Sequence, residues 1–504
     1  MSAGTVDLPH DASDEHTRRS RRVAIIGAGP GGICTGVRLL ERGHDDFVIL
    51  EKAPGIGGTW FHNRYPGAEC DIKSHLYSFS FAPNPAWSRR YARQPEIKAY
   101  LEDVVDRFGL RSHIRLGTLV RTMRWDDAAA VWHITVGDGE VVDADIVVSA
   151  IGMFGEPVTP DVPGLERFQG TLFHSAEWAD DHDVTGERVA VIGSAASAVQ
   201  LIPEIAPLVG SLTVYQRTAN WVSPKDDDPY TEEELATFAE QPHTLQASRD
   251  EIFTSIDPNL TFADAERRAL YESYGRRNIE AVEDDELRAR LTPFGPYGSK
   301  RPLASNAYYP TFNLPHVELV TDAITEITEH GIVTADGTSR EVDTIILATG
   351  FTTTKFLAAL DVAGRNGVDI DDAWSDGPEA YLGITTSGFP NLFMLYGPNT
   401  NNGSIIYMIE CQVHYVMQML DAMDDHDLAW VDVKRDVMDE YNQAIQRALD
   451  DVEVWHAEVN GYYRVGDRIV TQWPGSMSSY RDRTLHVDLD AYESAPLPRR
   501  SLPA

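Results

Sequence analysis

Features of disulfide-bonded, membrane-spanning and nucleic-acid-binding proteins are scarce in this sequence. Three cysteines occur in 504 residues, widely spaced and without a C-x-x-C pair, which argues against a disulfide framework, a zinc site or a dithiol redox pair. The sequence contains no run of about 18 apolar residues, so we expect no membrane-spanning helix. Lys and Arg number 43 against 78 Asp and Glu, a net charge of −35 that argues against nucleic acid or anionic membranes as partners. We therefore expect a cytoplasmic protein without a metal site.

Length and composition allow several sizeable domains. A chain of 504 residues with 42% apolar residues is long enough for about three domains, each with its own core. Residues 1–21 are polar and mixed in charge, and they lack the apolar segment of a signal peptide. We expect them to form a disordered tail.

The most informative stretch runs from Arg22 to Glu51. An apolar run at 23–26 leads into the turn GAGPGG at 27–32, followed by an expected helix and a second apolar run that ends at Glu51. Gly27 permits a tight turn, Gly29 lets a pyrophosphate approach the backbone, and Gly32 lets the helix pack closely on the strand. The helix N-terminus attracts phosphates, and Glu51 can accept hydrogen bonds from a ribose diol. The pattern predicts a dinucleotide site; a glycine-rich turn without a ligand is the alternative.

The same pattern returns at residues 189–217. An apolar run leads into GSAASA at 193–198, and Arg217 stands at the offset from Gly193 that separates Glu51 from Gly27. An acid at this position suits a free ribose diol, whereas an arginine suits a 2′-phosphate. We therefore assign FAD to the first unit and NADP(H) to the second. Ala195 replaces the middle glycine and is expected to crowd the pyrophosphate. A second nucleotide-like fold that no longer binds is the alternative.

Two further motifs precede the second unit. The segment F-x-G-x3-H-x3-W spans residues 168–178, and G-x-W-x4-Y-P-G-x3-D spans residues 58–71. Together with the paired nucleotide motifs they closely resemble the fingerprints of type I Baeyer–Villiger monooxygenases. Ala179, where the family has Pro or Asp, is a minor departure. Related flavin monooxygenases that oxidise nitrogen or sulfur share the glycine motifs but usually carry a smaller aromatic at the position of Trp178.

The resemblance implies a reaction and a set of site residues. Family members use NADPH and FAD to insert one oxygen atom of O2 next to a ketone carbonyl, through a flavin peroxide, giving an ester or lactone. The match implies that Arg301 supplies a cation for the peroxide anion, that Asp71 orients it, and that Lys300 joins Arg217 at the 2′-phosphate. The expected cofactor-binding residues are Gly27, Gly29, Gly32, Glu51, Gly58, Thr59, Trp60, Asp71, Gly193, Ser194, Ala195, Ser197, Arg217, Thr218, Lys300 and Asn399.

The alternatives are an N- or S-oxygenating flavin monooxygenase and a non-catalytic redox sensor that binds both nucleotides. Trp178 favours ketone oxidation. We expect a monomer or a small homo-oligomer that acts on a small ketone.

The order of the motifs predicts an α/β fold with two Rossmann-like dinucleotide-binding domains and a helical insertion. A late G-P-N loop at 397–399 predicts that the end of the chain returns to the first domain. The expected divisions are an FAD domain from 22–155 and 378–504, an NADP domain from 165–222 and 300–352, and the insertion at 223–299.

Overall fold

The computed structural model describes residues 21–456 and 463–497. Residues 1–20 of the predicted tail therefore lie outside the described residues. Arg21, which we assigned to the tail, is instead buried, and its guanidinium donates to Asp424 at 2.7 Å and to the carbonyl of Leu428 at 3.0 Å. An ion pair with a segment 403 residues away makes Arg21 part of the folded body.

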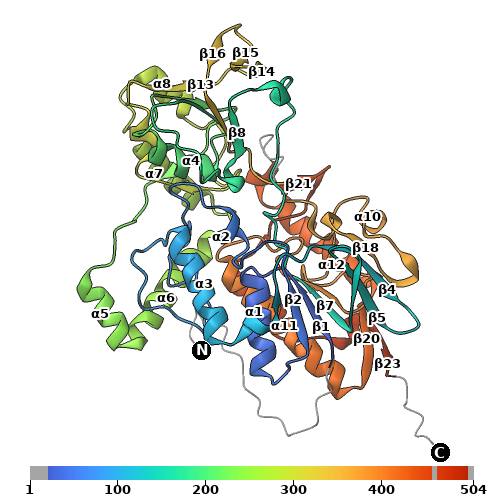
Figure 1. The fold of residues 1–504 in the computed structure, drawn as a ribbon. Coiled ribbons are helices and arrows are strands. Elements are labelled where there is room, and N and C mark those ends of the chain that lie inside the picture. Colours follow the sequence, from blue (N-terminus) through green and yellow to red (C-terminus); the bar gives the residue numbers. More distant parts are fainter. Residues whose placement is uncertain (1–20, 457–462, 498–504) are drawn as a thin grey trace, which may run out of the picture.

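The first sheet has five strands in the order β19-β7-β1-β2-β3, and all neighbouring pairs are parallel. Four of its strands are short, apolar and largely buried, as parallel sheets require, whereas the edge strand β3 is only partly buried. Helix α11 packs against α1, and β19 brings the late part of the chain into the sheet that begins at residue 23 (Figure 1). The elements are β1 (Val23–Ile26), α1 (Pro30–Glu41), β2 (Phe47–Leu50), β3 (Ile114–Arg115), β7 (Ile146–Ser149), β19 (Leu392–Met394) and α11 (Ile405–Asp425).

The second sheet repeats this architecture, with the order β13-β10-β9-β17-β8 and only parallel pairs. It forms the upper part of Figure 1, with α4 packed beside it. The two parallel sheets confirm the predicted α/β class. The elements are β8 (Thr171–His174), β9 (Arg188–Ile192), α4 (Ala196–Ile205), β10 (Ser211–Tyr215), α9 (Tyr308–Thr311), β13 (Val317–Val320) and β17 (Thr344–Leu347).

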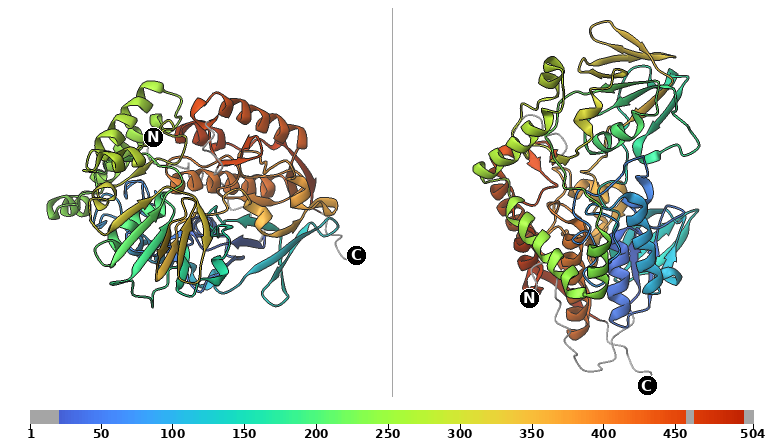
Figure 2. Two further views of the ribbon diagram at one scale, coloured as in Figure 1. Left: turned by 90° about the horizontal axis from the view of Figure 1, so that it is seen from above. Right: turned by 90° about the vertical axis from the view of Figure 1, so that its left-hand side faces the viewer.

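Smaller sheets decorate both parts. A four-stranded sheet, β18-β4-β5-β6, lies beside the first sheet, and the three strands β14–β16 project at the opposite end of the molecule (Figures 1 and 2). Asp336 and Gly337 lie in the turn between β15 and β16, where an Asp-Gly pair favours a hairpin. The strands are β4 (Val120–Asp126), β5 (Val131–Val136), β6 (Glu140–Ala144), β18 (Asp361–Ala363), β14 (Ile324–Ile327), β15 (Gly331–Thr334) and β16 (Ser339–Glu341).

The insertion is helical, as predicted, but its helices divide between the two parts. Ile252 and Phe253 of α6 join the core under the first sheet, whereas Ile279 of α7 and Leu291 of α8 join the core under the second. Figure 1 shows α5 and α6 beside α3, and α7 and α8 beside α4. Apolar faces, which charge runs concealed in the sequence, decide this division. The helices are α3 (Gln94–Arg107), α5 (Glu232–Glu240), α6 (Pro242–Ile256), α7 (Ala265–Ile279) and α8 (Asp285–Leu291).

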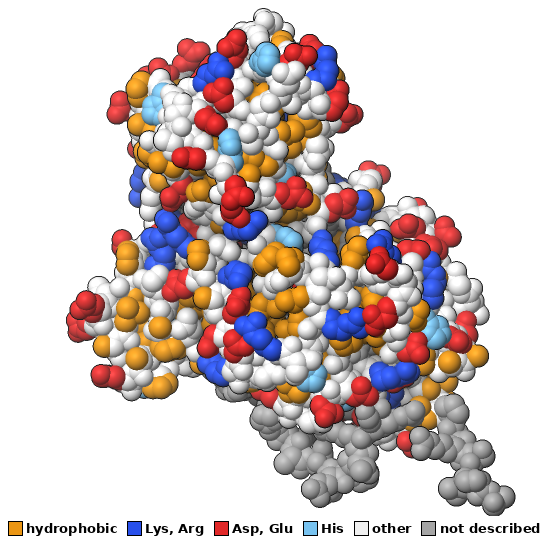
Figure 3. All heavy atoms as spheres, in the orientation of Figure 1, with side chains coloured by type: hydrophobic (Ala, Val, Ile, Leu, Met, Phe, Trp, Pro, Cys, Tyr) orange, Lys and Arg blue, Asp and Glu red, His pale blue; other side chains and the backbone are white. Residues whose placement is uncertain are grey.

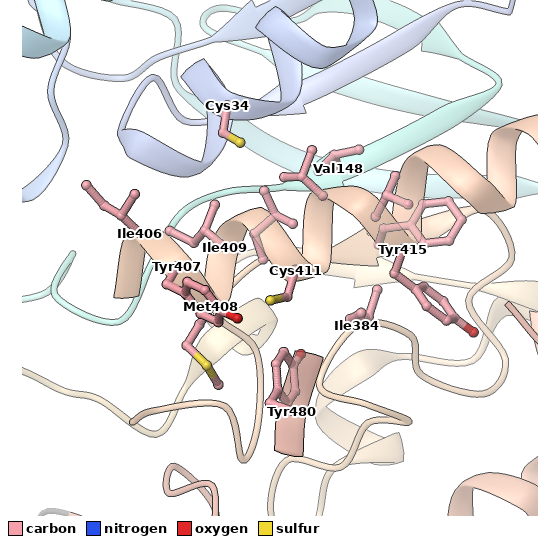
Figure 4. Packing of buried hydrophobic residues seen from close by; sticks show 14 of the residues in the cluster. Cys34, Val148, Ile384, Ile406, Tyr407, Met408, Ile409, Cys411, Tyr415 and Tyr480 are labelled. Carbon is pink, nitrogen blue, oxygen red and sulfur yellow. The ribbon is translucent and has the colours of Figure 1, made fainter. Parts of the chain in front are cut away.

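The largest core lies where α11 crosses the first sheet. Figure 4 shows Cys34 of α1 and Val148 of β7 facing the side chains of α11, with Tyr480 closing the far side. All three cysteines are buried and reduced. The remaining elements are α2 (Thr59–His62), β11 (Val222–Ser223), β12 (Leu303–Ala304), α10 (Ile370–Ala373), β20 (Leu428–Val433), α12 (Arg435–Asp450), β21 (Arg464–Val465), β22 (Arg468–Ile469), α13 (Met477–Thr484) and β23 (Tyr492–Pro496).

The surface shown in Figure 3 mixes acidic and basic side chains, so the net negative charge is spread and not gathered into one patch on this face. Within the described residues, no helix is long and apolar enough to span a bilayer.

Candidate active site

Both turns are packed so tightly at their first glycine that a side chain is excluded at that position. Gly27 has φ +104°, and an added β-carbon would lie 2.7 Å from the carbonyl oxygen of Ala150. Gly193 has φ +124°, and its β-carbon would lie 2.3 Å from the carbonyl oxygen of Ala348. A β-carbon on Gly32 would lie 2.0 Å from the carbonyl oxygen of Gly27. Each turn is therefore pressed against the end of a neighbouring strand, with its backbone open for a ligand.

The helices that follow these turns start without side-chain caps. Helix α1 begins after Gly29 and helix α4 after Ala195, and neither residue accepts a hydrogen bond with its side chain. In the insertion, Thr231, Asp264 and Asp284 cap α5, α7 and α8, whereas α6 also starts without a side-chain cap. The first N–H groups of α1 and α4 are thus available to a phosphate, which a helix N-terminus attracts.

The two strand-end residues that we expected to distinguish the nucleotides lie in different surroundings. Glu51 is buried, and its carboxylate accepts hydrogen bonds from the backbone N–H groups of Ala28 and Ala53, both at 2.7 Å. Each carboxylate oxygen can accept more than one hydrogen bond, so Glu51 can brace the first turn and still bind a diol. Arg217 is exposed at the corresponding point of the second sheet.

Cations gather beside the second turn. The Lys300 ammonium donates to the hydroxyl of Thr218, and burial together with the nearby positive charge of Arg217 lowers the pKa of Lys300. Ser194 donates to the carbonyl of Thr218 at 3.3 Å, which joins this group to the turn. A cavity here is lined by residues 218–221, 293–295 and 299–301. The two cations Lys300 and Arg217 repel each other, and their combined positive charge suits the binding of an anion.

The 58–71 motif bridges the two turns. A β-carbon on Gly58, which has φ +56°, would lie 2.9 Å from the α-carbon of Gly29. At the other end of the motif, a β-carbon on Gly67 would lie 2.6 Å from the carbonyl oxygen of Gln200 in α4, and the Tyr65 hydroxyl donates to the Gln200 side chain at 2.8 Å. The loop therefore contacts the first glycine turn and the helix of the second.

The density of glycine and proline in this motif predicts an irregular loop without helix or strand, which is wrong for one turn. Residues Thr59–His62 form the short helix α2, which starts after Gly58. Trp60 is buried there and donates its indole N–H to the Tyr77 hydroxyl at 3.1 Å. Flanking glycines hid a helical turn that this packing stabilises.

Asp71 and Arg301 meet although they are 230 residues apart. Arg301 donates from Nε and Nη2 to the same carboxylate oxygen of Asp71, with the Nε contact at 3.0 Å. Desolvation opposes ionisation of Asp71, but the charge and hydrogen bonds of Arg301 outweigh it and lower the pKa of Asp71. The pair is thus carboxylate and guanidinium at neutral pH, next to the cavity that holds Lys300.

The motif at 168–178 contains β8, the edge strand of the second sheet, and makes mostly packing contacts. A β-carbon on Gly170 would lie 2.3 Å from the carbonyl oxygen of Asp343. The His174 ring nitrogen Nδ1 accepts from the N–H of Ala176 at 3.1 Å, and Trp178 packs edge-on against Phe173 at 5.0 Å. These contacts lie within the second sheet and the residues next to it.

Asn399 lies in the late loop next to the first sheet. It has φ +56° and is buried, and its amide donates to the carbonyls of Ile469 and Gln472 at 2.9 and 3.1 Å. Its side-chain oxygen has no hydrogen-bond partner within the described part of the chain. A buried acceptor of this kind is costly unless a ligand or water satisfies it.

The sequence did not identify two residues that contact the 58–71 loop from distant parts of the chain. Gln200 holds the bridging loop, and Lys225 contacts the residues just before Asp71. Lys225 stands at the start of an acidic run, where it resembled a solvated charge. No pattern in the sequence pairs either residue with its partner.

Comparison with known proteins shows the family to which the chain belongs. Residues 24–268 match the family model described as pyridine nucleotide-disulphide oxidoreductase. Over 96% of its length the chain is 42% identical to a Baeyer–Villiger monooxygenase of Pseudomonas aeruginosa, covering 93% of that protein, and 40% identical to one of Streptomyces coelicolor, covering 94%. Its fold matches cyclohexanone monooxygenase from Rhodococcus sp. Phi1 bound to NADP+, with a TM-score of 0.86 and 31% identity over 95% of this chain and 100% of that one. These near full-length similarities show that the chain belongs to the Baeyer–Villiger monooxygenase family.

Proposed function

We propose that this chain inserts one oxygen atom of O2 next to a ketone carbonyl to give an ester or lactone, with FAD at the first glycine turn and NADPH as the reductant at the second. Family membership supports the reaction. The observation that carries the assignment of residues is the Arg301–Asp71 pair, which ends a loop in contact with both nucleotide units.

The residues around the first turn fit FAD. Gly58 approaches Gly29 so closely that a side chain on Gly58 has no room, and helix α1 starts without a side-chain cap. Asn399, in the loop after β19, has a buried side-chain oxygen with no hydrogen-bond partner among the described residues. Gly27 and Gly32 shape the turn, Glu51 binds the ribose, and Thr59 and Trp60 border the cofactor. When bound and reduced, FAD activates O2 for oxygen transfer.

The second turn fits NADP(H). Ser194, Ala195 and Ser197 lie at the uncapped start of α4, where the pyrophosphate binds. Arg217, Thr218 and Lys300 surround the 2′-phosphate, which relieves the repulsion that lowers the pKa of Lys300. Because a guanidinium and an ammonium both face this point, the site prefers NADPH to NADH.

Arg301 supplies a fixed positive charge where negative charge develops on the reacting oxygen. A preorganised cation stabilises such charge without having to reorient during the reaction. Asp71 accepts both guanidinium hydrogen bonds on one oxygen and holds the group in place. Lysine does not reproduce this planar contact.

We further propose a cytoplasmic enzyme, where NADPH is supplied, that is a monomer or a small homo-oligomer and acts on a small ketone. Light scattering of the purified protein measures the oligomeric state.

Product analysis tests the reaction. The purified FAD-loaded enzyme is offered NADPH with a panel of cyclic, linear and aromatic ketones and, separately, a panel of tertiary amines. Esters or lactones from at least one ketone class support the proposal. Oxidation of amines alone would show that the chain is an N-oxygenating flavin monooxygenase.

A further inference from the structure

Lys225 is a buried cation beside the catalytic pair. It follows β11, and its side chain is only 3% exposed. Its ammonium donates to a carboxylate oxygen of Glu69 at 2.5 Å and to the carbonyl oxygen of Cys70 at 3.4 Å. It also lies 4.4 Å from the centre of the Tyr91 ring. Lys225 thus holds the two residues that directly precede Asp71.

The backbone of Lys225 is tied to the segment that carries Arg301. Its N–H donates to the side-chain oxygen of Asn306 at 2.8 Å, and the Asn306 amide donates back to the Lys225 carbonyl at 2.6 Å. Strand β11 pairs in parallel with β12, which starts two residues after Arg301. The segment that carries Arg301 thus contacts Lys225 through Asn306, and Lys225 contacts residues 69 and 70. The ion pair between Asp71 and Arg301 completes this ring of contacts.

The catalytic pair needs such support. The side chains of Arg301 and Asp71 are 44% and 35% exposed, and an exposed ion pair is typically worth about 0–1 kcal/mol. A contact of this strength keeps the guanidinium in place only where the loop that carries Asp71 is itself fixed. A cation that is almost fully buried and contacts a carboxylate, a carbonyl and an aromatic ring restrains the loop much more firmly.

We propose that Lys225 is a positioning residue for oxygen transfer, which fixes the Asp71 loop to the Arg301 segment so that the guanidinium keeps the geometry that the reaction needs. This inference rests on the proposed roles of Arg301 and Asp71. A purely structural role, in which Lys225 only neutralises the buried Glu69, makes a different prediction for the doubly substituted protein.

The test compares Lys225→Met with Lys225→Met/Glu69→Gln in the FAD-loaded enzyme. Lys225→Met leaves the Glu69 carboxylate buried and unpaired, so the melting temperature falls. The double variant contains no unpaired charge, so its melting temperature recovers, but the Cys70 carbonyl still lacks its cation. We expect ester formed per NADPH to stay about tenfold or more below wild type in both variants, because small displacements of a catalytic group are costly.

The rate of flavin reduction, the hydrogen peroxide formed and a matched control variant complete the design. Anaerobic flavin reduction by NADPH should stay close to the wild-type rate in both variants, with the missing oxygen recovered as hydrogen peroxide. Lys73→Met removes a lysine two residues after Asp71 whose ion pair with Asp226, at 2.9 Å, is exposed. This control should change neither the melting temperature nor the ester yield.

Two results would overturn the proposal: a normal ester yield in Lys225→Met, or a yield that recovers together with the melting temperature in the double variant. If Lys225→Met does not fold, the double variant alone decides. Arg301→Ala is assayed alongside. Loss of ester in that variant with a normal yield in Lys225→Met would refute only the role of Lys225, whereas a normal yield in Arg301→Ala would refute the proposed roles of the pair.

Discussion

The two cations beside the second turn allow a quantitative prediction about the preference for NADPH over NADH. Arg217 is exposed and Lys300 is partly buried, with a pKa lowered by burial and by Arg217. A charge-assisted hydrogen bond is typically worth about 1.5–3 kcal/mol. Because solvent screens Arg217, we take the lower end of this range and expect Arg217→Ala to raise the Michaelis constant for NADPH roughly tenfold. The constant for NADH, which lacks the 2′-phosphate, should change little.

The assay is the rate of anaerobic flavin reduction, measured over a range of NADPH and NADH concentrations in one buffer at two salt concentrations. Higher salt should weaken NADPH binding more in the wild type than in Arg217→Ala, since the variant has one cation fewer at the phosphate. Arg167→Ala is the control, because its ion pair with Glu326, at 2.8 Å, is on the exposed surface. Equal effects of Arg217→Ala on both cofactors would refute the assignment of the phosphate site.

Two further predictions concern the FAD site and the core. Gly58→Ala places a β-carbon 2.9 Å from the Gly29 α-carbon at φ +56°, so the purified variant should have a low ratio of flavin to protein absorbance. Gly43→Ala is the control: it has φ +69° with open space around it and should retain FAD at a cost of about 1–2 kcal/mol of stability. Full flavin content in both variants would refute the close approach of Gly58 to Gly29. Burial raises the pKa of Asp432 to about 6, so the folded state binds the proton more tightly than the unfolded state and stability falls as pH rises from about 4 to about 6. Asp432→Asn removes this loss, and its melting temperature relative to wild type should therefore be more favourable at pH 7.5 than at pH 4.5; a pH-independent difference would contradict the raised pKa.

Local sequence patterns were sufficient to predict the two parallel sheets. Runs such as 23–26 and 189–192 are apolar throughout, and a glycine follows each of them directly, as a tight strand-to-helix turn requires. The return of the chain to the first sheet at β19 was predicted from a short loop motif. These features are determined by residues close together in the sequence.

The parts that were not predicted depend on contacts between distant segments. The insertion divides between two cores because Ile252 faces one and Ile279 the other, and the surrounding charges hid both apolar faces. Asp71 and Arg301 were paired by resemblance, since nothing within their own segments shows that they meet. The burial of Lys225 results from packing of the 69–71 loop, which no pattern in an acidic run reveals.

The central claim is that Arg301 stabilises developing negative charge during oxygen transfer and does not merely bind a nucleotide. The most direct measurement is the amount of ester formed per NADPH consumed by Arg301→Ala, with FAD content and anaerobic flavin reduction measured on the same preparation. We predict that the variant holds FAD, is still reduced by NADPH and releases hydrogen peroxide, while ester formation falls roughly 10²–10³-fold. Arg301→Lys should recover little of the lost ester, because an ammonium does not make the planar contact with Asp71. A near-normal ester yield in Arg301→Ala would contradict the account.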